Sequence, residues 1–103
     1  MKKLFISQPM GNKTDEEILN ERETAVKAAK ILLNEDVEII DSFFQKQPEV
    51  KTKPLWYLGE SLKILSEADC VYFGEGWKEA RGCKIEHTCA KEYGVTILND
   101  IEV

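Results

Sequence analysis

The sequence predicts an α/β fold in which a parallel β-sheet is covered by helices on both faces. Four short apolar runs alternate with three longer segments of helical periodicity along the chain, and this alternation is typical of parallel sheets. The run at residues 69–73, "DCVYF", continues in apolar residues without alternation, which indicates a strand buried on both faces. A chain of 103 residues is long enough for one compact core, so we predict a single domain over residues 1–103.

The first half of the chain is predicted to form a strand, a long helix and a second strand. Residues 4–7 are an apolar run that stops at the turn-rich residues 8–12. Thr14 is the expected N-cap of the next helix, and Glu17, three residues later, completes a capping box. Residues 37–41 are expected to be the second strand. The apolar residues of the helix keep helical spacing, without glycine or proline between them: Ile18, Leu19, Ala25, Val26, Ala29, Leu32 and Leu33.

The second half of the chain continues the alternation of helices and strands. Residues 45–54 are a polar connection with two prolines, of a length typical of lids and mobile loops. An amphipathic helix and the strand at 69–73 follow this connection. A third helix is predicted over residues 82–93, with Gly94 as its C′ residue, and residues 95–98 form the last strand. The apolar stripe of the middle helix consists of Leu55, Leu58, Leu62, Leu65 and Ala68.

Composition excludes several classes of protein. The net charge of −5 argues against binding of a nucleic-acid polymer, although it leaves a single bound nucleotide open. The apolar run near the N-terminus is too short for a signal sequence and is interrupted by Gln8 and Pro9. No segment has transmembrane length, so no membrane partner is expected. Three cysteines without framework spacing indicate reduced thiols and a cytoplasmic location.

Two loops are expected to meet where ligands bind in such sheets, beyond the carboxyl ends of the strands at the point where strand order reverses. The loop at 7–12, "SQPMGN", carries Gly11 and small or polar side chains that suit a sugar or phosphate close to the backbone. It is not a phosphate-binding loop of known pattern, and a plain loop before a capped helix explains it equally well. Near the second loop, at 74–82, Trp77 and Tyr72 are candidates for stacking on a base, with a core position as the alternative for Tyr72.

Glu86 is the candidate catalytic residue. It lies in the first turns of the third helix, near backbone N–H groups of residues 82–84 that lack an intrahelical acceptor. Those groups and the helix dipole are expected to favour the ionised carboxylate. A carboxylate at this edge of the sheet can attack the anomeric carbon of a sugar and form a covalent glycosyl intermediate. An ordinary acidic residue in the first turn of a helix is the simpler interpretation.

Cys83 and His87 give a second possible chemistry. They are four residues apart on one helix face, so an imidazole could activate the thiol. A zinc site would need Cys89 or Cys70 as a third ligand. The sequence has no Cys-x-x-Cys pair and His87 is its one histidine, so we expect Cys70 and Cys89 to be small core residues.

Several stretches together carry a resemblance to a known family. They are "LFISQPMGN" at 4–12, "EADCVYF" at 67–73, "GWKEARGCKIE" at 76–86, and the closing pattern of Ala90, Tyr93, Gly94, Val95 and Leu98. With this pattern the chain resembles the nucleoside 2-deoxyribosyltransferase-like superfamily, in particular its compact branch, over almost the entire sequence. The resemblance implies a flavodoxin-like, Rossmann-like three-layer sandwich with a four-stranded parallel sheet in the order 2-1-3-4.

The resemblance also implies roles for particular residues. Glu86 falls on the position of the nucleophile that takes the deoxyribosyl group, and Cys83 stands where transferases usually have threonine. The substrate would be a nucleoside or nucleoside monophosphate, and no cofactor or metal is implied. The expected substrate-binding residues are Ser7, Gln8, Pro9, Met10, Gly11, Trp77, Arg81, Gly82 and Cys83.

Arg81 departs from the transferases, which commonly have an acidic residue at this position. A guanidinium beside the free N–H groups of a helix start suits phosphate, so we expect a preference for 5′-monophosphates. The alternative is a local ion pair with one of three nearby carboxylates, those of Glu75, Glu79 and Glu86.

Three classes of function therefore follow from the sequence. The first is an N-glycosidase or deoxyribosyltransferase with a covalent glycosyl-Glu86 intermediate, the second a non-catalytic nucleotide-binding module, and the third a Cys/His metal or thiol protein. Transferases continue past the last strand with residues that close a neighbouring subunit's site, whereas here only Asn99 and Asp100 could do so, which argues against transfer. Hydrolysis of an N-glycosidic bond needs fewer residues, and the sequence leaves both reactions open. A homodimer or higher oligomer is expected from the family and from apolar helix surface around Leu55 and Trp56.

Overall fold

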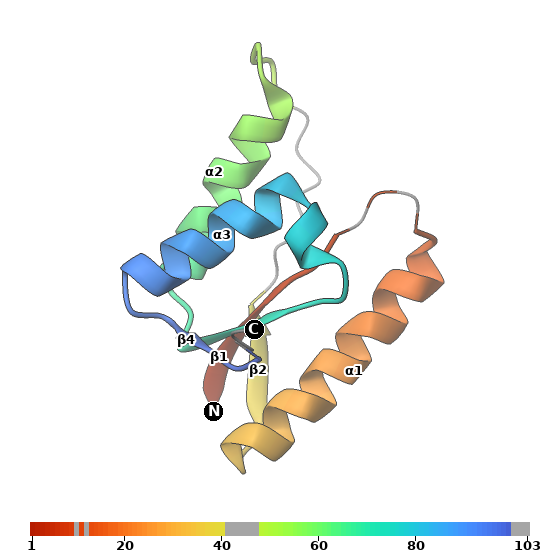
Figure 1. The fold of residues 1–103 in the computed structure, drawn as a ribbon, viewed down its shortest axis with the longest axis vertical. Helices are drawn as coiled ribbons and strands as arrows, with labels where there is room; N and C mark the ends of the chain where they lie inside the picture. The colour runs from red at the N-terminus through yellow and green to blue at the C-terminus, as the bar shows by residue number, and fades with distance from the viewer. Residues whose placement is uncertain (10, 12, 41–47, 100–103) are drawn as a thin grey trace.

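The sheet has four parallel strands in the order β2-β1-β3-β4, as the sequence and its resemblance predicted (Figure 1). The structure is a computed structural model that describes residues 1–9, 11, 13–40 and 48–99. Met10, Asn12, Asp41 and Asp100, which the predictions included, lie outside the described residues. The elements are β1 (Lys2–Ser7), α1 (Asp15–Leu33), β2 (Val37–Ile40), α2 (Lys53–Leu65), β3 (Cys70–Phe73), the 3₁₀ turn η1 (Trp77–Glu79), α3 (Arg81–Glu92) and β4 (Thr96–Ile97).

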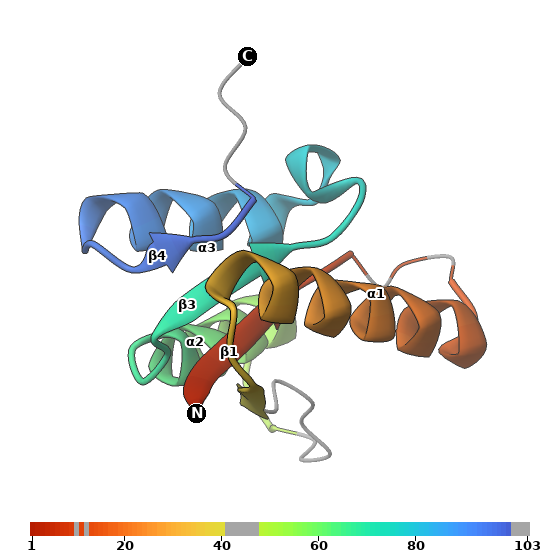
Figure 2. The same ribbon diagram turned by 90° about the horizontal axis from the view of Figure 1, so that it is seen from below.

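The three layers follow from the alternation of side chains along β1 and β3. Leu4 and Ile6 point to one face of the sheet, where they pack with Cys70 against α1. Phe5 points to the other face and packs with Val71 against α2 and α3. Figure 2 shows α1 and α3 on opposite sides of the strands. Both faces of the two central strands are therefore covered, as the apolar run at 69–73 indicated.

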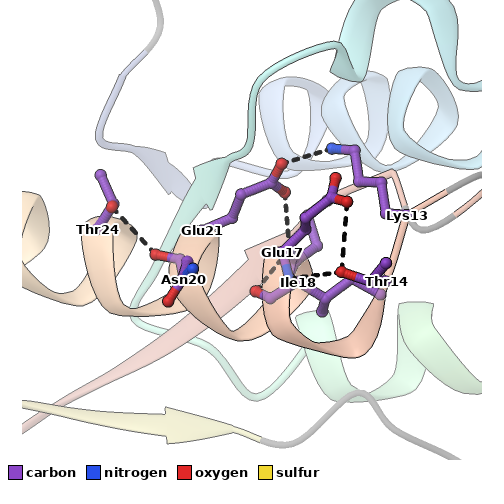
Figure 3. Close-up of polar contacts among 8 residues, drawn as sticks. Lys13, Thr14, Glu17, Ile18, Asn20, Glu21 and Thr24 are labelled. Atoms are coloured by element: carbon purple, nitrogen blue, oxygen red, sulfur yellow. Dashed lines mark hydrogen bonds and ion pairs between the residues drawn. The ribbon is translucent and has the colours of Figure 1, made fainter.

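Helix ends follow the predicted capping rules with one difference. The Thr14 hydroxyl accepts a hydrogen bond from the Glu17 N–H at 3.1 Å, which is the N-cap bond (Figure 3). The Glu17 carboxylate accepts from the Thr14 hydroxyl at 3.3 Å, whereas a full capping box would use the Thr14 N–H. At the end of α3, Gly94 has a φ of +76° and the Val95 N–H donates to the Ala90 carbonyl at 2.9 Å, which confirms the C′ glycine.

Other predicted details were wrong in the extent of elements. The third helix begins and ends one residue before the predicted range 82–93, and β4 is shorter than the predicted 95–98 because Val95 takes part in the helix cap. The prediction also assigned too many residues to the buried face of α1, because Leu19 and Leu32 are 60% and 58% exposed. The small residues Ala25 and Ala29 bring the helix close to the sheet and leave the flanking leucines outside.

No helix among the described residues is long and apolar enough to cross a membrane.

Candidate functional site

The strand order reverses between β1 and β3, and this is where the candidate site lies. β1 has β2 on one side and β3 on the other, so the connections that leave β1 and β3 diverge at their carboxyl ends. Ser7 and Phe73 are partners at these ends, and the Gly74 N–H donates to the Ser7 carbonyl at 2.7 Å. Sheets of this kind bind ligands beyond the carboxyl ends of the strands at such a reversal.

Glu86 reaches this point from α3. Its carboxylate Oε1 accepts a hydrogen bond from the Ser7 hydroxyl at 3.0 Å, across 79 residues of sequence. Both residues are buried, with 2% of Ser7 and 7% of Glu86 exposed. Ser7 occupies the same face of β1 as Phe5, the face that α3 covers, because side chains alternate along a strand. The structure therefore brings together Ser7 and Glu86, which the sequence predicted as binding and catalytic residues.

The expectation that Glu86 is held in its ionised form was wrong. Burial raises the pKa of Glu86 from its ordinary 4.5 to about 7, although the hydrogen bond from Ser7 opposes this rise. Glu86 is the sixth residue of α3, so it lies beyond the first turn, where the free N–H groups are. The Lys84 N–H already donates to the Ala80 carbonyl at 3.0 Å. Loss of water around the carboxylate outweighs the helix dipole here.

Cys83 lies beside this pair. Burial raises the pKa of its thiol above the ordinary 9.0, a hydrogen bond with Ser7 opposes the rise, and the nearby Glu86 carboxylate adds to it. A thiol with a raised pKa carries little thiolate at neutral pH and is a poor nucleophile. Cys83 is therefore a small buried residue that packs beside Ser7 and Glu86. The thiol chemistry considered from the sequence is not favoured.

The metal alternative is not supported by the arrangement of side chains either. Among the described residues, which include all three cysteines and His87, no group of three His, Cys, Asp or Glu side chains is placed to hold a metal ion. The ring of His87 stacks on Trp77 with 4.3 Å between centroids, and it meets Phe73 edge-on at 5.0 Å. His87 thus belongs to an aromatic cluster that fixes η1 against α3.

Gln8 and Lys13 hold the start and end of the β1–α1 connection against α1. The Gln8 amide nitrogen donates to the Glu21 carboxylate at 3.1 Å. Lys13 pairs with the same carboxylate at 2.7 Å, as Figure 3 shows. Gln8 is 7% exposed, and its Oε1 has no hydrogen-bond partner among the described residues. Pro9 is half-buried, whereas Gly11 is exposed. Lys13 and Glu21 were not predicted, because two charged residues eight positions apart carry no sequence signal of such a bond.

Gly74 marks a close approach between the two strand ends. A Cβ at this position would lie 3.0 Å from the Gln8 Cβ and 3.6 Å from the Ser7 carbonyl oxygen. Because a buried backbone cannot move freely, we expect Gly74→Ala to lower the free energy of unfolding by about 1–3 kcal/mol. Urea denaturation measures this change, with Gly82→Ala as the control, since a Cβ at Gly82 meets nothing within 4 Å. Equal loss in both variants would contradict a steric role for Gly74.

Trp77 lies in the wall of a hollow that Ser7 and Glu86 do not line. This hollow has a volume of about 680 Å³ and lies along the β3–η1 connection, with Asn99 on its other side. One face of the Trp77 ring is covered by His87, so the predicted stacking on a base has at most the other face or the ring edge. The Asn99 side chain accepts a hydrogen bond from the Phe73 N–H at 3.0 Å and donates one to the Phe73 carbonyl at 2.6 Å. These two bonds extend the β3–β4 hydrogen-bond pattern beyond the end of β4.

Arg81 and Gly82 lie in the wall of another hollow, of about 350 Å³, where α2 and α3 both begin. Thr52 and Pro54, at the start of α2, lie opposite them. Neither helix has a side-chain hydrogen bond at its N-cap. Within the described residues Arg81 forms no ion pair, so the local salt bridge considered from the sequence is absent. The sequence carries a signal for this second helix start, a threonine two residues before a proline.

Comparison with known proteins gives a family for the chain but no activity. Neither the curated proteins nor the solved structures gave a match. A family profile matches residues 2–99, which include every described element of the sheet and of the candidate site. The chain belongs to the family described as "Domain of unknown function (DUF4406)".

Proposed function

We propose that the protein cleaves the N-glycosidic bond of a nucleoside or nucleoside monophosphate, with Glu86 as the nucleophile. The observation that carries this proposal is the buried Glu86 carboxylate at the strand-order reversal, hydrogen-bonded to Ser7 at 3.0 Å. Burial of an acidic side chain costs folding free energy, and such residues are concentrated at functional sites. The resemblance of the sequence to nucleoside 2-deoxyribosyltransferase-like proteins, in which a glutamate at this position is the nucleophile, supports the same chemistry.

The reaction has two steps. A Glu86 carboxylate oxygen bonds to the anomeric carbon, the C–N bond breaks, and the base leaves with the electron pair and takes up a proton. Water then attacks the glycosyl-Glu86 ester, which releases the free sugar and restores the carboxylate. Transfer of the sugar to a second base would replace water by that base. The Ser7 hydroxyl holds Oε1 and fixes the orientation of the carboxylate toward the substrate.

The direct test is a panel of nucleosides and their 5′-monophosphates incubated with the purified protein, with release of free base followed by chromatography. Release from at least one substrate supports the proposal. Binding without release, measured by calorimetry on the same panel, would indicate a non-catalytic nucleotide-binding module of the same fold. If the protein neither binds nor cleaves any of the purine and pyrimidine substrates, the proposal is refuted.

The Arg81 hollow supports 5′-monophosphates as the preferred substrates. The starts of α2 and α3 both line the 350 Å³ hollow, so both helix dipoles favour an anion there. The first backbone N–H groups of α3, at Arg81 and Gly82, have no intrahelical acceptor, whereas Pro54 in α2 has no N–H. Arg81 is exposed and unpaired within the described residues, so its guanidinium is available to a phosphate.

We expect Arg81→Ala to remove most of the preference for a monophosphate over its nucleoside. A hydrogen bond to a charged group contributes about 1.5–3 kcal/mol, so the preference should fall on the order of tenfold to a hundredfold. Calorimetric titration of one nucleoside and its monophosphate into both proteins measures the difference. Lys84→Ala, which removes an exposed charge from the same helix, is the control. Equal affinities for the two ligands in the wild type would exclude a phosphate site.

A homodimer in the cytoplasm completes the proposal. Leu55 is 63% exposed at the start of α2, and such an apolar surface favours association. All three cysteines are free thiols, which supports a reducing compartment. We expect light scattering at micromolar concentration to give the mass of a dimer. Because Leu55 also lines the hollow beside Arg81, Leu55→Glu should both shift this mass toward the monomer and weaken the binding of a monophosphate. A monomeric wild type would contradict the dimer without affecting the proposed chemistry.

A further inference from the structure

A groove lies on the side of α1 that faces the edge of the sheet, and none of the residues proposed for catalysis or substrate binding lines it. It has a volume of about 380 Å³ and runs between α1 and β2. Its apolar lining is Leu19, Val26 and Ile39, of which Leu19 is 60% and Ile39 is 39% exposed. Ile39 pairs in register with Leu4, whose side chain packs toward α1, so Ile39 lies on the same face of the sheet as the helix.

The rim of this groove is basic in an acidic protein. Arg22, Lys27 and Lys30 line it together with one acidic residue, Glu23, whereas the whole chain has a net charge of −5. Lys30 is 3.8 Å from Asp36, but the two side chains are 49% and 73% exposed, so this pair contributes little. Arg22 and Lys27 form no ion pair within the described residues.

The groove also adjoins an edge strand. In the sheet of the described residues β2 pairs with β1 and has no second neighbour. An edge of this kind can accept an added strand through its backbone groups, while the side chains of that strand choose the partner. Every second residue of an added strand would point toward α1, where apolar side chains meet Leu19 and Ile39 and charged ones meet the basic rim.

We propose that this groove binds an extended segment of another protein, in which the residues facing α1 are alternately apolar and acidic. A second copy of the chain fits less well. A two-fold axis through the groove would place Arg22, Lys27 and Lys30 of one copy against the same residues of the other, and like charges across an interface are unfavourable. An acidic segment, by contrast, complements both the charge of the rim and the apolar lining.

The probe is a short fluorescent peptide of Val-Thr-Glu-Thr repeats, which presents valine and glutamate on one face of a strand. The matched peptide has Val-Thr-Lys-Thr repeats. We expect anisotropy titrations to show binding of the glutamate peptide at least about tenfold tighter than that of the lysine peptide, with a decrease at high salt. In NMR spectra, the amide signals of Leu19 and Ile39 should shift on addition of the glutamate peptide.

Two charge-reversed proteins make the test specific. Arg22→Glu/Lys27→Glu should weaken the glutamate peptide at least about tenfold, whereas Lys51→Glu/Lys53→Glu, with the same change in net charge on exposed residues elsewhere, should not. Equal loss in both variants, equal affinity for the two peptides, or no binding at millimolar concentration would overturn the proposal. So would a wild-type dimer that Leu19→Asp disperses, since a second copy would then occupy the groove. None of these readouts depends on glycosidase activity.

Discussion

Glu86→Gln is expected to abolish base release, with a loss on the order of 10³-fold or more in kcat/KM. The amide keeps the size of the side chain and can still accept the Ser7 hydrogen bond, so this contact is retained while the nucleophilic carboxylate is lost. In the wild type the carboxylate must be ionised to attack, and its pKa of about 7 predicts that kcat/KM rises with pH through neutrality. Base release over pH 5 to 9 measures both effects.

Two controls separate a nucleophile from a residue that only supports the pocket. Cys83→Ser should keep most of the activity, because the Cys83 thiol has a raised pKa and no part in the proposed bond-making. Glu86→Ala leaves room for a small external nucleophile, and azide should restore cleavage and give a glycosyl azide product. Comparable loss from Cys83→Ser and Glu86→Gln would move the chemistry to the thiol.

The same Glu86→Gln substitution is expected to stabilise the folded protein above pH 7. The pKa of Glu86 is about 7 when folded and, at its ordinary value, 4.5 when unfolded. Between these values the folded state binds more protons than the unfolded state, so stability falls as pH rises and then stays level above pH 7. At 1.36 kcal/mol for each pKa unit, ionising the buried carboxyl costs roughly 3 kcal/mol by pH 8.

Urea denaturation of the wild type and the glutamine variant at pH 5 and pH 8 tests this prediction. The two proteins should differ more at pH 8 than at pH 5, with the variant more stable at the higher pH by an amount on the order of 2–3 kcal/mol. Glu79→Gln, on an exposed residue of η1, should show no such growth with pH. A wild type whose stability does not change between pH 5 and 8 would show that Glu86 is hydrated, contrary to its 7% exposure.

Gain of stability on loss of activity would itself be informative. If replacing a residue stabilises the fold, that residue is retained for a reason other than stability, and catalysis is the most direct one. The two Glu86 predictions therefore support each other through unrelated measurements. Loss of activity with loss of stability would instead indicate a structural carboxyl, whose removal disturbs the end of β1.

The fold was predictable because its signals are local or follow general rules. The apolar runs of β1 and β3, the Thr14 cap and the Gly94 C′ position each depend on a few neighbouring residues. Parallel pairing follows from the alternation of strands and helices. The strand order was given by the family resemblance, and the structure confirms it.

The candidate site was predictable only in part. The sequence identified Ser7 and Glu86, but their hydrogen bond joins residues 79 positions apart, and no local pattern encodes it. The raised pKa of Glu86 depends on how completely α3 and β1 exclude water, so it could not be foreseen from the position of Glu86 in a helix. The separation of Trp77 from Arg81 into two hollows likewise depends on η1, a turn of three residues that carries no periodicity.

The central place of β1 has a consequence for biosynthesis. β1 precedes both of its neighbours in the chain, so the ribosome makes Leu4, Phe5 and Ile6 long before their strand partners at 37–40 and 70–73. Until the later partner leaves the exit tunnel, this apolar strand has one bare edge and one uncovered face. Nascent chains thus expose an aggregation-prone segment until residues 70–73 have emerged, and a chaperone that shields short apolar strands would act on β1.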